Sequence, residues 1–172
     1  VEGLSSSQAA LLSDKSTDRA EDVLTHCAKG DIFLLTMQDA LYPDRLRNIY
    51  DPPVLLYGRG RMPLFDEEAA VSVVGTLTCT PYGLSAAEEL GYQLAKEGAV
   101  VVSGLAKGID GASHRGALRA GGFTAAVLGG GVDVVYPAEN RRLYEDIAAT
   151  GVLLSEYPPG TEPMGSHFPV RN

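Results

Sequence analysis

From Val71 onward the chain alternates regularly between apolar runs and amphipathic stretches, and this alternation constrains the fold more than any other feature. The predicted strands are Val71–Val74, Ala99–Ser103, Thr124–Leu128 and Val152–Ser155, and the predicted helices are Tyr82–Glu97, Ile109–Ala120 and Asn140–Ala149. Apolar strands that alternate with helices predict a parallel sheet covered on both faces. With right-handed crossovers, the pattern predicts an α/β domain with a doubly wound, mostly parallel, Rossmann-like sheet.

The helix boundaries carry matching signals. Thr80 is an N-cap residue and Pro81 follows it at the first helical position. Gly98 stands where the first helix should end, and Asn140 is an N-cap candidate for the third.

The first 70 residues divide into two parts. Residues 1–30 are predicted to be the remnant of an N-terminal helical domain, a small helical segment that cannot bury a core of its own. Residues 31–70 are predicted to lead into the Rossmann-like domain at 71–172. The expected elements are short helices at Ser7–Leu12 and Thr17–Cys27, a strand at Ile32–Thr36, a helix at Tyr42–Ile49 and a strand at Val54–Tyr57.

Composition narrows the class of protein. Hydrophobic residues make up 45% of the chain and charged residues 21%, as in globular domains. No apolar run is long enough for a membrane span, and no signal peptide is visible. The two cysteines, Cys27 and Cys79, lack metal-type spacing, so we expect a reduced cytoplasmic protein without a metal site.

The net charge of -8 argues against binding to duplex DNA over a broad basic face. It permits a small pocket that grips a few phosphates through backbone N–H groups.

Glycine and hydroxyl residues follow the predicted strands. Residues 75–80, 103–108 and 129–131 come directly after the first three strands and contain Thr76, Ser103 and Lys107. Ligands bind at this edge of such sheets, and glycines let backbone N–H groups approach a phosphate. For any one loop, tight turning explains the glycines equally well, whereas convergence of three loops favours an anion pocket. No G-x-G-x-x-G motif follows the first strand, so we expect no dinucleotide cofactor.

Other reactive residues favour structural roles. Asp110 and His114 lie four apart on one helix, and with Ser103 they suggest a hydrolase triad, but the spacing matches no known arrangement. We expect a capping aspartate, a packed histidine and no catalytic residue. Four aromatic residues are candidates for base stacking or for ordinary packing: Tyr57, Tyr82, Tyr136 and Phe168.

Several motifs then occur in a characteristic order. They are Tyr42-Pro43-Asp44-Arg45-Leu46, Asp51-Pro52-Pro53-Val54-Leu55-Leu56-Tyr57, Val74-Gly75-Thr76, Thr80-Pro81-Tyr82-Gly83, Ser103-Gly104-Leu105-Ala106-Lys107-Gly108-Ile109-Asp110, Gly129-Gly130-Gly131, Tyr136-Pro137, Ser155-Glu156-Tyr157-Pro158-Pro159-Gly160, and Phe168-Pro169-Val170-Arg171-Asn172. As a set spanning residues 31–172, they resemble the DNA-processing protein A (DprA/Smf) family.

The resemblance implies a recombination mediator rather than an enzyme. Members of this family bind incoming single-stranded DNA during natural transformation, protect it, load the RecA recombinase and form homodimers, without a cofactor. With the third glycine loop included, the resemblance nominates as DNA-binding residues Gly75, Thr76, Ser103, Gly104, Lys107, Gly129, Gly130, Arg171 and Asn172.

Two departures from the family pattern matter. Leu77 stands where the family usually has arginine, and Val170 stands where a basic residue is common. The chain also stops at Asn172, within the Phe-Pro-x-Arg-Asn motif, so we expect the family's remaining strands and main dimer surface to be missing.

Two alternatives stay open. One is a nucleotide-processing enzyme of the lysine-decarboxylase-like Rossmann group, whose Pro-Gly-Gly-x-Gly-Thr-x-x-Glu motif is absent from this sequence. The other is a nucleotide-sensing domain.

Overall fold

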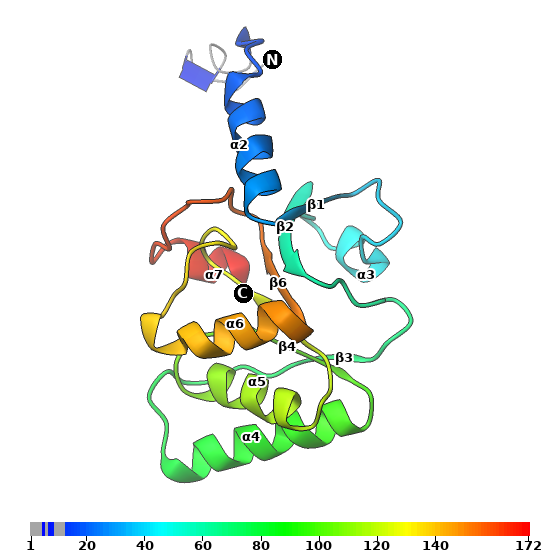
Figure 1. Cartoon of the computed structure of the whole chain (residues 1–172), viewed down its shortest axis with the longest axis vertical. Coiled ribbons are helices and arrows are strands. Elements are labelled where there is room, and N and C mark those ends of the chain that lie inside the picture. Colours follow the sequence, from blue (N-terminus) through cyan, green and yellow to red (C-terminus); the bar gives the residue numbers. More distant parts are fainter. Residues whose placement is uncertain (1–4, 6, 9–12) are drawn as a thin grey trace.

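A computed structural model describes residues 5, 7–8 and 13–172 and contains a six-stranded mixed sheet (Figure 1). Its strands are β1 (Phe33–Thr36), β2 (Leu55–Gly60), β3 (Ala70–Ser72), β4 (Val100–Ser103), β5 (Thr124–Val127) and β6 (Val152–Ser155), in the spatial order β1-β2-β6-β5-β4-β3. β3 to β6 pair in parallel, whereas β1 and β2 extend the sheet beyond β6 in antiparallel pairing. The predicted mostly parallel α/β class is confirmed.

The described helices are α2 (Asp18–Lys29), α3 (Asp44–Arg47), α4 (Pro81–Lys96), α5 (Ile109–Arg119), the 3-10 helix η1 (Ala138–Asn140), α6 (Arg141–Thr150) and α7 (His167–Arg171). α4, α5 and α6 follow the predicted positions closely. α3 is shorter than the predicted helix, and η1 and α7 were not predicted. The predicted helix at Ser7–Leu12 falls mainly outside the described residues. Among those described, no helix combines the length and apolarity that crossing a membrane requires.

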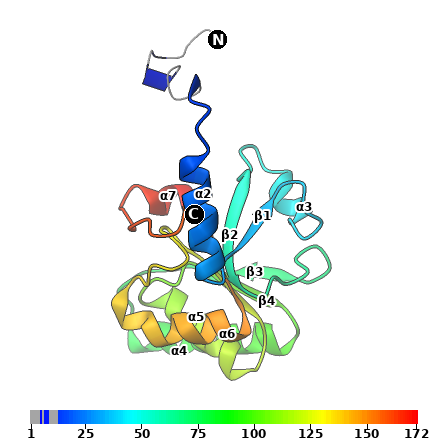
Figure 2. The ribbon, with the colours of Figure 1, turned by 45° about the horizontal axis from the view of Figure 1, so that its top comes forward.

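The winding of the sheet differs from the doubly wound order. β3, β4, β5 and β6 are neighbours in chain order, so successive right-handed crossovers place α4, α5 and α6 on one face (Figures 1 and 2). Val101 and Leu153 pack toward this helical layer, and the alternate residues Val100 and Val152 pack with Phe65 on the opposite face. Double winding requires the strand order to reverse, and apolar periodicity carries no information on that direction.

Residues 31–70 complete one edge of the sheet. β2 runs on to Gly60, three residues beyond the predicted strand Val54–Tyr57, and Gly60 adopts a positive φ of 104°. α2 projects from the body of the molecule and packs at its base through Cys27 (Figure 2). Tyr57 lies in the same cluster and is buried, so of the two roles left open for it, base stacking or packing, the structure shows packing.

α4 and α5 pack at very short range. A Cβ atom at Gly91 would collide with the backbone of Ser113, and one at Gly116 would collide with the carbonyl oxygen of Glu88. The two glycines therefore allow α5 to pack directly on α4. This contact positions the first residues of both helices, where the preceding loops end.

Candidate nucleic-acid interface

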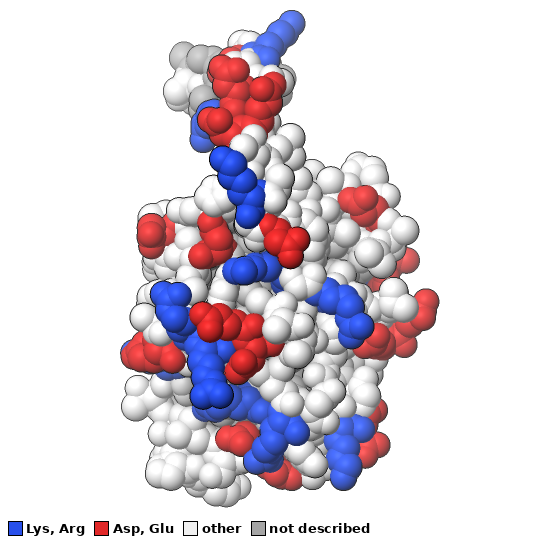
Figure 3. Space-filling view, in the orientation of Figure 1, with Lys and Arg blue, Asp and Glu red and all other residues white. Residues whose placement is uncertain are grey.

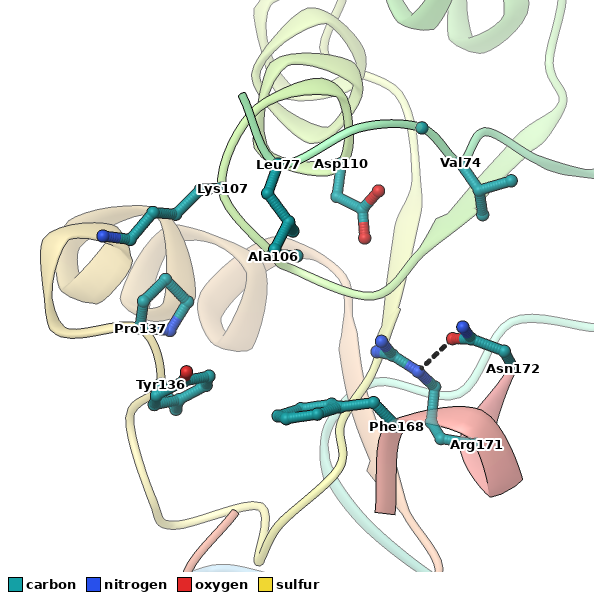
Figure 4. Close-up of a pocket in the computed structure, with 11 residues that line it drawn as sticks. Val74, Leu77, Ala106, Lys107, Asp110, Tyr136, Pro137, Phe168, Arg171 and Asn172 are labelled. Carbon is teal, nitrogen blue, oxygen red and sulfur yellow. Dashed lines mark hydrogen bonds between the residues drawn. The ribbon is translucent and has the colours of Figure 1, made fainter. Parts of the chain in front are cut away.

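A cavity of about 460 Å³ opens at the carboxyl edge of the parallel strands, against α7 (Figure 4). Four segments build it: the loop after β3, the loop joining β4 to α5, the loop before η1, and the C-terminal segment. The lining residues are Val74, Gly75, Leu77, Ala106, Lys107, Asp110, Tyr136, Pro137, Phe168, Arg171 and Asn172.

The loop after β3 approaches the start of α5 closely. A Cβ atom at Gly75 would lie 2.6 Å from Cγ1 of Ile109, so only glycine fits there. The Thr76 carbonyl accepts a hydrogen bond from the Ile109 N–H (3.3 Å), and its Oγ1 donates to the Thr78 carbonyl (3.0 Å). Leu77 lines the cavity and is 62% exposed.

The loop before α4 ends at Thr80, which caps the helix. Oγ1 of Thr80 accepts a hydrogen bond from the Gly83 N–H at 3.1 Å, and Pro81 is the first helical residue. The predicted capping role of Thr80 is confirmed.

Hydrogen bonds between side chains and backbone shape the loop after β4. The Ser103 hydroxyl is buried and donates to the Val73 carbonyl (2.6 Å), so it ties β4 to the end of β3 instead of facing the cavity. The Gly104 N–H donates to Oδ2 of Asp110 (3.1 Å). Asp110 thus closes the loop, whereas the sequence suggested a helix cap; the residue at the N-cap position is Gly108, with a φ of 75°.

Lys107 stands at the rim of the cavity, and its ammonium is ion-paired with the Glu139 carboxylate of η1. This hydrogen bond raises the pKa of Lys107 and lowers the pKa of Glu139. Asn140 follows Glu139, and its side-chain amide donates to the carbonyls of Leu105 (3.0 Å) and Ala106 (3.2 Å). Asn140 stands at the predicted N-cap position of α6, but its side chain joins two loops and makes no cap hydrogen bond.

The third glycine loop packs under the C-terminal segment and is not among the residues lining the main cavity. A Cβ atom at Gly129 would lie 2.8 Å from the Phe168 ring, and one at Gly130 would lie 2.9 Å from the Thr161 carbonyl oxygen. The Gly129 carbonyl accepts from Nδ1 of His167 (2.9 Å), and the Gly130 carbonyl accepts from the buried Ser155 hydroxyl (2.7 Å). These glycines allow the C-terminal segment to seat against the sheet.

Arg171 joins the ends of two strands. Its Nη1 donates to the carbonyls of Gly104 (3.0 Å) and Val127 (2.5 Å), which follow β4 and end β5. Its Nε donates to Oδ1 of Asn172 at 2.9 Å (Figure 4). Burial lowers the pKa of Arg171, and the nearby Asp110 carboxylate opposes that shift. Its sequence motif gave no sign of this structural role.

Two aromatic rings form one wall of the cavity. Tyr136 and Phe168 stack with centroids 5.8 Å apart and an interplanar angle of 25°. Figure 4 shows them on the same side of the cavity as Pro137, with Arg171 beside Phe168. Tyr82, another stacking candidate, is 82% exposed at the start of α4 and does not line this cavity.

The arrangement suits a ligand that has both an anionic part and a flat apolar part. Lys107 and Arg171 supply positive charge, and Tyr136 and Phe168 supply ring surface. Phosphates pair with such cations, and nucleobases stack on such rings. The described residues contain no cluster of side chains that could hold a metal ion.

Comparison with known proteins decides the family. The family model for DNA recombination-mediator protein A matches residues 33–172. The chain belongs to this family. DNA processing protein DprA of Bacillus subtilis is 44% identical over 150 residues, which cover 87% of this chain and 50% of that protein. Protein Smf of Escherichia coli is 33% identical over 81% of this chain and 37% of its own length. The chain spans about half the length of the curated relatives it matches.

Solved structures of DprA share the fold. The crystal structure of DprA from Streptococcus pneumoniae matches with a TM-score of 0.78 and 38% identity, covering 96% of this chain and 60% of that one. DprA from Helicobacter pylori matches with a TM-score of 0.71 and 33% identity over 80% of this chain and 62% of that one. That structure concerns its single-stranded DNA binding mode. The Rossmann-like class is thereby confirmed.

Surface charge around the DprA-like core is mixed. Figure 3 shows a run of adjoining Lys and Arg side chains over the region of α6 and α5, with Asp and Glu side chains beside it. Because the net charge is -8, binding of an anion must depend on local groups.

Proposed function

We propose that the cavity binds single-stranded DNA and that the protein acts as a recombination mediator in natural transformation. In this role it protects incoming DNA and delivers it to the RecA recombinase, as a homodimer and without catalysis of its own. We place this activity in the cytoplasm, in keeping with Cys27 and Cys79, which are both free thiols in the described part of the chain.

The observation that carries the proposal is the pairing of cations and stacked rings in one cavity. Lys107 and Arg171 lie where phosphates can reach them, and Tyr136 and Phe168 offer a surface for bases. Family membership and the DNA-binding relative from Helicobacter pylori support the same ligand.

The nominated residues fall into two roles in this proposal. Gly75, Lys107 and Asn172 line the cavity and approach the phosphate directly. Thr76 is outside the lining and supports the first loop through its hydroxyl, which donates to the Thr78 carbonyl. The supporting residues hold the loops and the C-terminal segment in place and comprise Ser103, Gly104, Gly129 and Gly130, with Arg171 serving both roles.

The test is fluorescence anisotropy of a labelled oligothymidine with the wild-type chain and with Lys107→Gln. Loss of one phosphate contact should weaken binding about tenfold at low salt. Lys96→Gln is the matched control, since Lys96 is exposed on α4 and lies over the Tyr92 ring, away from the cavity lining. Equal affinities for the two variants would contradict the assignment of the site.

A turnover assay separates the proposal from the enzymatic alternative. The chain is incubated with nucleoside monophosphates, and released base is measured by chromatography. We expect no release. Sustained release of base would identify a nucleotide-processing enzyme and would overturn the mediator proposal.

A further inference from the structure

Lys107, the rim cation of the proposed site, already has an anionic partner within the chain. Its ammonium pairs with the Glu139 carboxylate, and the two side chains are 55% and 63% exposed. Each group holds the other in its charged form, since their hydrogen bond raises the pKa of Lys107 and lowers that of Glu139. In the free protein the positive charge of Lys107 is therefore locally neutralised.

The backbone keeps these two side chains beside each other. Glu139 lies in η1, directly after the cavity-lining Pro137. The next residue, Asn140, donates two hydrogen bonds to the carbonyls of Leu105 and Ala106, the residues that immediately precede Lys107. Because these bonds tie the two loops together, the Lys107 and Glu139 side chains stay within reach of each other.

The other cation of the cavity is more constrained. Nη1 of Arg171 is engaged by two backbone carbonyls, and Leu77 contributes no charge. Within the described lining, Lys107 is thus the cation whose charge no backbone carbonyl engages. A phosphate and Glu139 require the same ammonium, and a carboxylate at that place also repels the phosphate.

We propose that Glu139 is an affinity-determining residue that competes with DNA phosphate for Lys107. This inference rests on the proposed function. Binding then requires the phosphate to displace Glu139 from Lys107, so Glu139 weakens the site for single-stranded DNA.

The test compares the affinity of Glu139→Gln and Glu89→Gln for labelled oligothymidine at low salt. Glu89 is the matched control because it is also an exposed glutamate in an ion pair, with Arg119 on the outer side of α4 and α5. We expect Glu139→Gln to bind about three- to tenfold more tightly than wild type and Glu89→Gln to stay within about twofold of it. Both positions are exposed, and thermal unfolding checks that each variant is folded.

A second comparison distinguishes competition for Lys107 from a general change in charge. In the Lys107→Gln background, the added Glu139→Gln change should give no further gain, because the contested ammonium is gone. A gain that persists in full in that background would overturn the inference, as would equal affinities of Glu139→Gln and Glu89→Gln. In either case, the proposed function still stands if the wild-type chain binds oligothymidine and Lys107→Gln binds it more weakly. Failure of every variant to bind would overturn both.

Discussion

Leu77 places an apolar side chain at the mouth of a site that we propose for a polyanion. It is exposed and lines the cavity from the same loop as Gly75. Leu77→Arg should therefore raise the affinity for oligothymidine about tenfold at low salt, because it adds one phosphate contact.

Leu90→Arg controls for this added charge, since Leu90 is 49% exposed on α4 and outside the cavity lining. Anisotropy titrations of both variants provide the comparison. If Leu77→Arg gains no more than Leu90→Arg, the first loop does not contact phosphate.

His114 shows how a buried polar residue makes stability depend on pH. Thr124 donates its hydroxyl hydrogen to the Val101 carbonyl (2.7 Å), so it accepts from Nδ1–H of His114, also at 2.7 Å. Nε2 is buried without a hydrogen-bond partner in the described structure. Burial, with a smaller contribution from Arg115, lowers the pKa of His114 to about 3.

Because that pKa lies below the unfolded value, the unfolded state takes up a proton at His114 as pH falls below about 6.5, while the native state stays neutral. The free energy of unfolding should then fall by up to about 1.4 kcal/mol per pH unit between roughly pH 6.5 and 3. Urea unfolding at several pH values measures it, and subtraction of the profile of His114→Gln isolates this residue. Parallel profiles of the two proteins would contradict this, because they would show that His114 takes up its proton equally in the native and unfolded states.

At the scale of the element, the contact between α4 and α5 positions the two loops of the cavity that lead into these helices. Gly116→Ala should lower the free energy of unfolding by about 3 kcal/mol, because the new Cβ would meet the Glu88 carbonyl and push the helices apart. Gly165→Ala is the control, since no atom lies within 4 Å of a Cβ placed there. Urea denaturation distinguishes them; a cost below about 1 kcal/mol for Gly116→Ala would mean that the helices separate easily.

The elements were predictable from sequence where periodicity and capping determine them. Thr80 and Pro81 indicated the start of α4, and the apolar runs indicated β4 to β6. The direction of winding and the attachment of β2 beside β6 depend on which strands pair, which periodicity does not record. α7 escaped prediction because five residues give too little periodicity, although the helix carries Arg171.

The sequence predicted which residues belong to the candidate site better than it predicted what each of them does. The motifs nominated Ser103 and the glycines of the third loop, but a motif does not show that a hydroxyl turns to Val73 or that Phe168 covers Gly129. The partner of Lys107 was not predictable, because Glu139 is 32 residues away in the chain and meets it only through the fold.

For the whole molecule, a net charge of -8 requires DNA binding to depend on a few local contacts. With Lys107 and Arg171 as the cations of the cavity lining, about two phosphates are neutralised, so the logarithm of affinity should fall with the logarithm of salt concentration at a slope of about -1.4. Titrations over a range of salt concentrations measure the slope. A slope steeper than about -4 would indicate an extended basic surface that this account does not contain.

The most direct test of the central claim is photocrosslinking of an oligonucleotide that contains 5-iodouracil, followed by identification of the linked peptides by mass spectrometry. The account predicts crosslinks at Tyr136 and Phe168, the stacked rings of the cavity. Tyr50 and Tyr82 are the internal controls, because both are highly exposed and lie outside the cavity lining. Crosslinks confined to Tyr50 or Tyr82 would contradict the account and place the DNA on another surface.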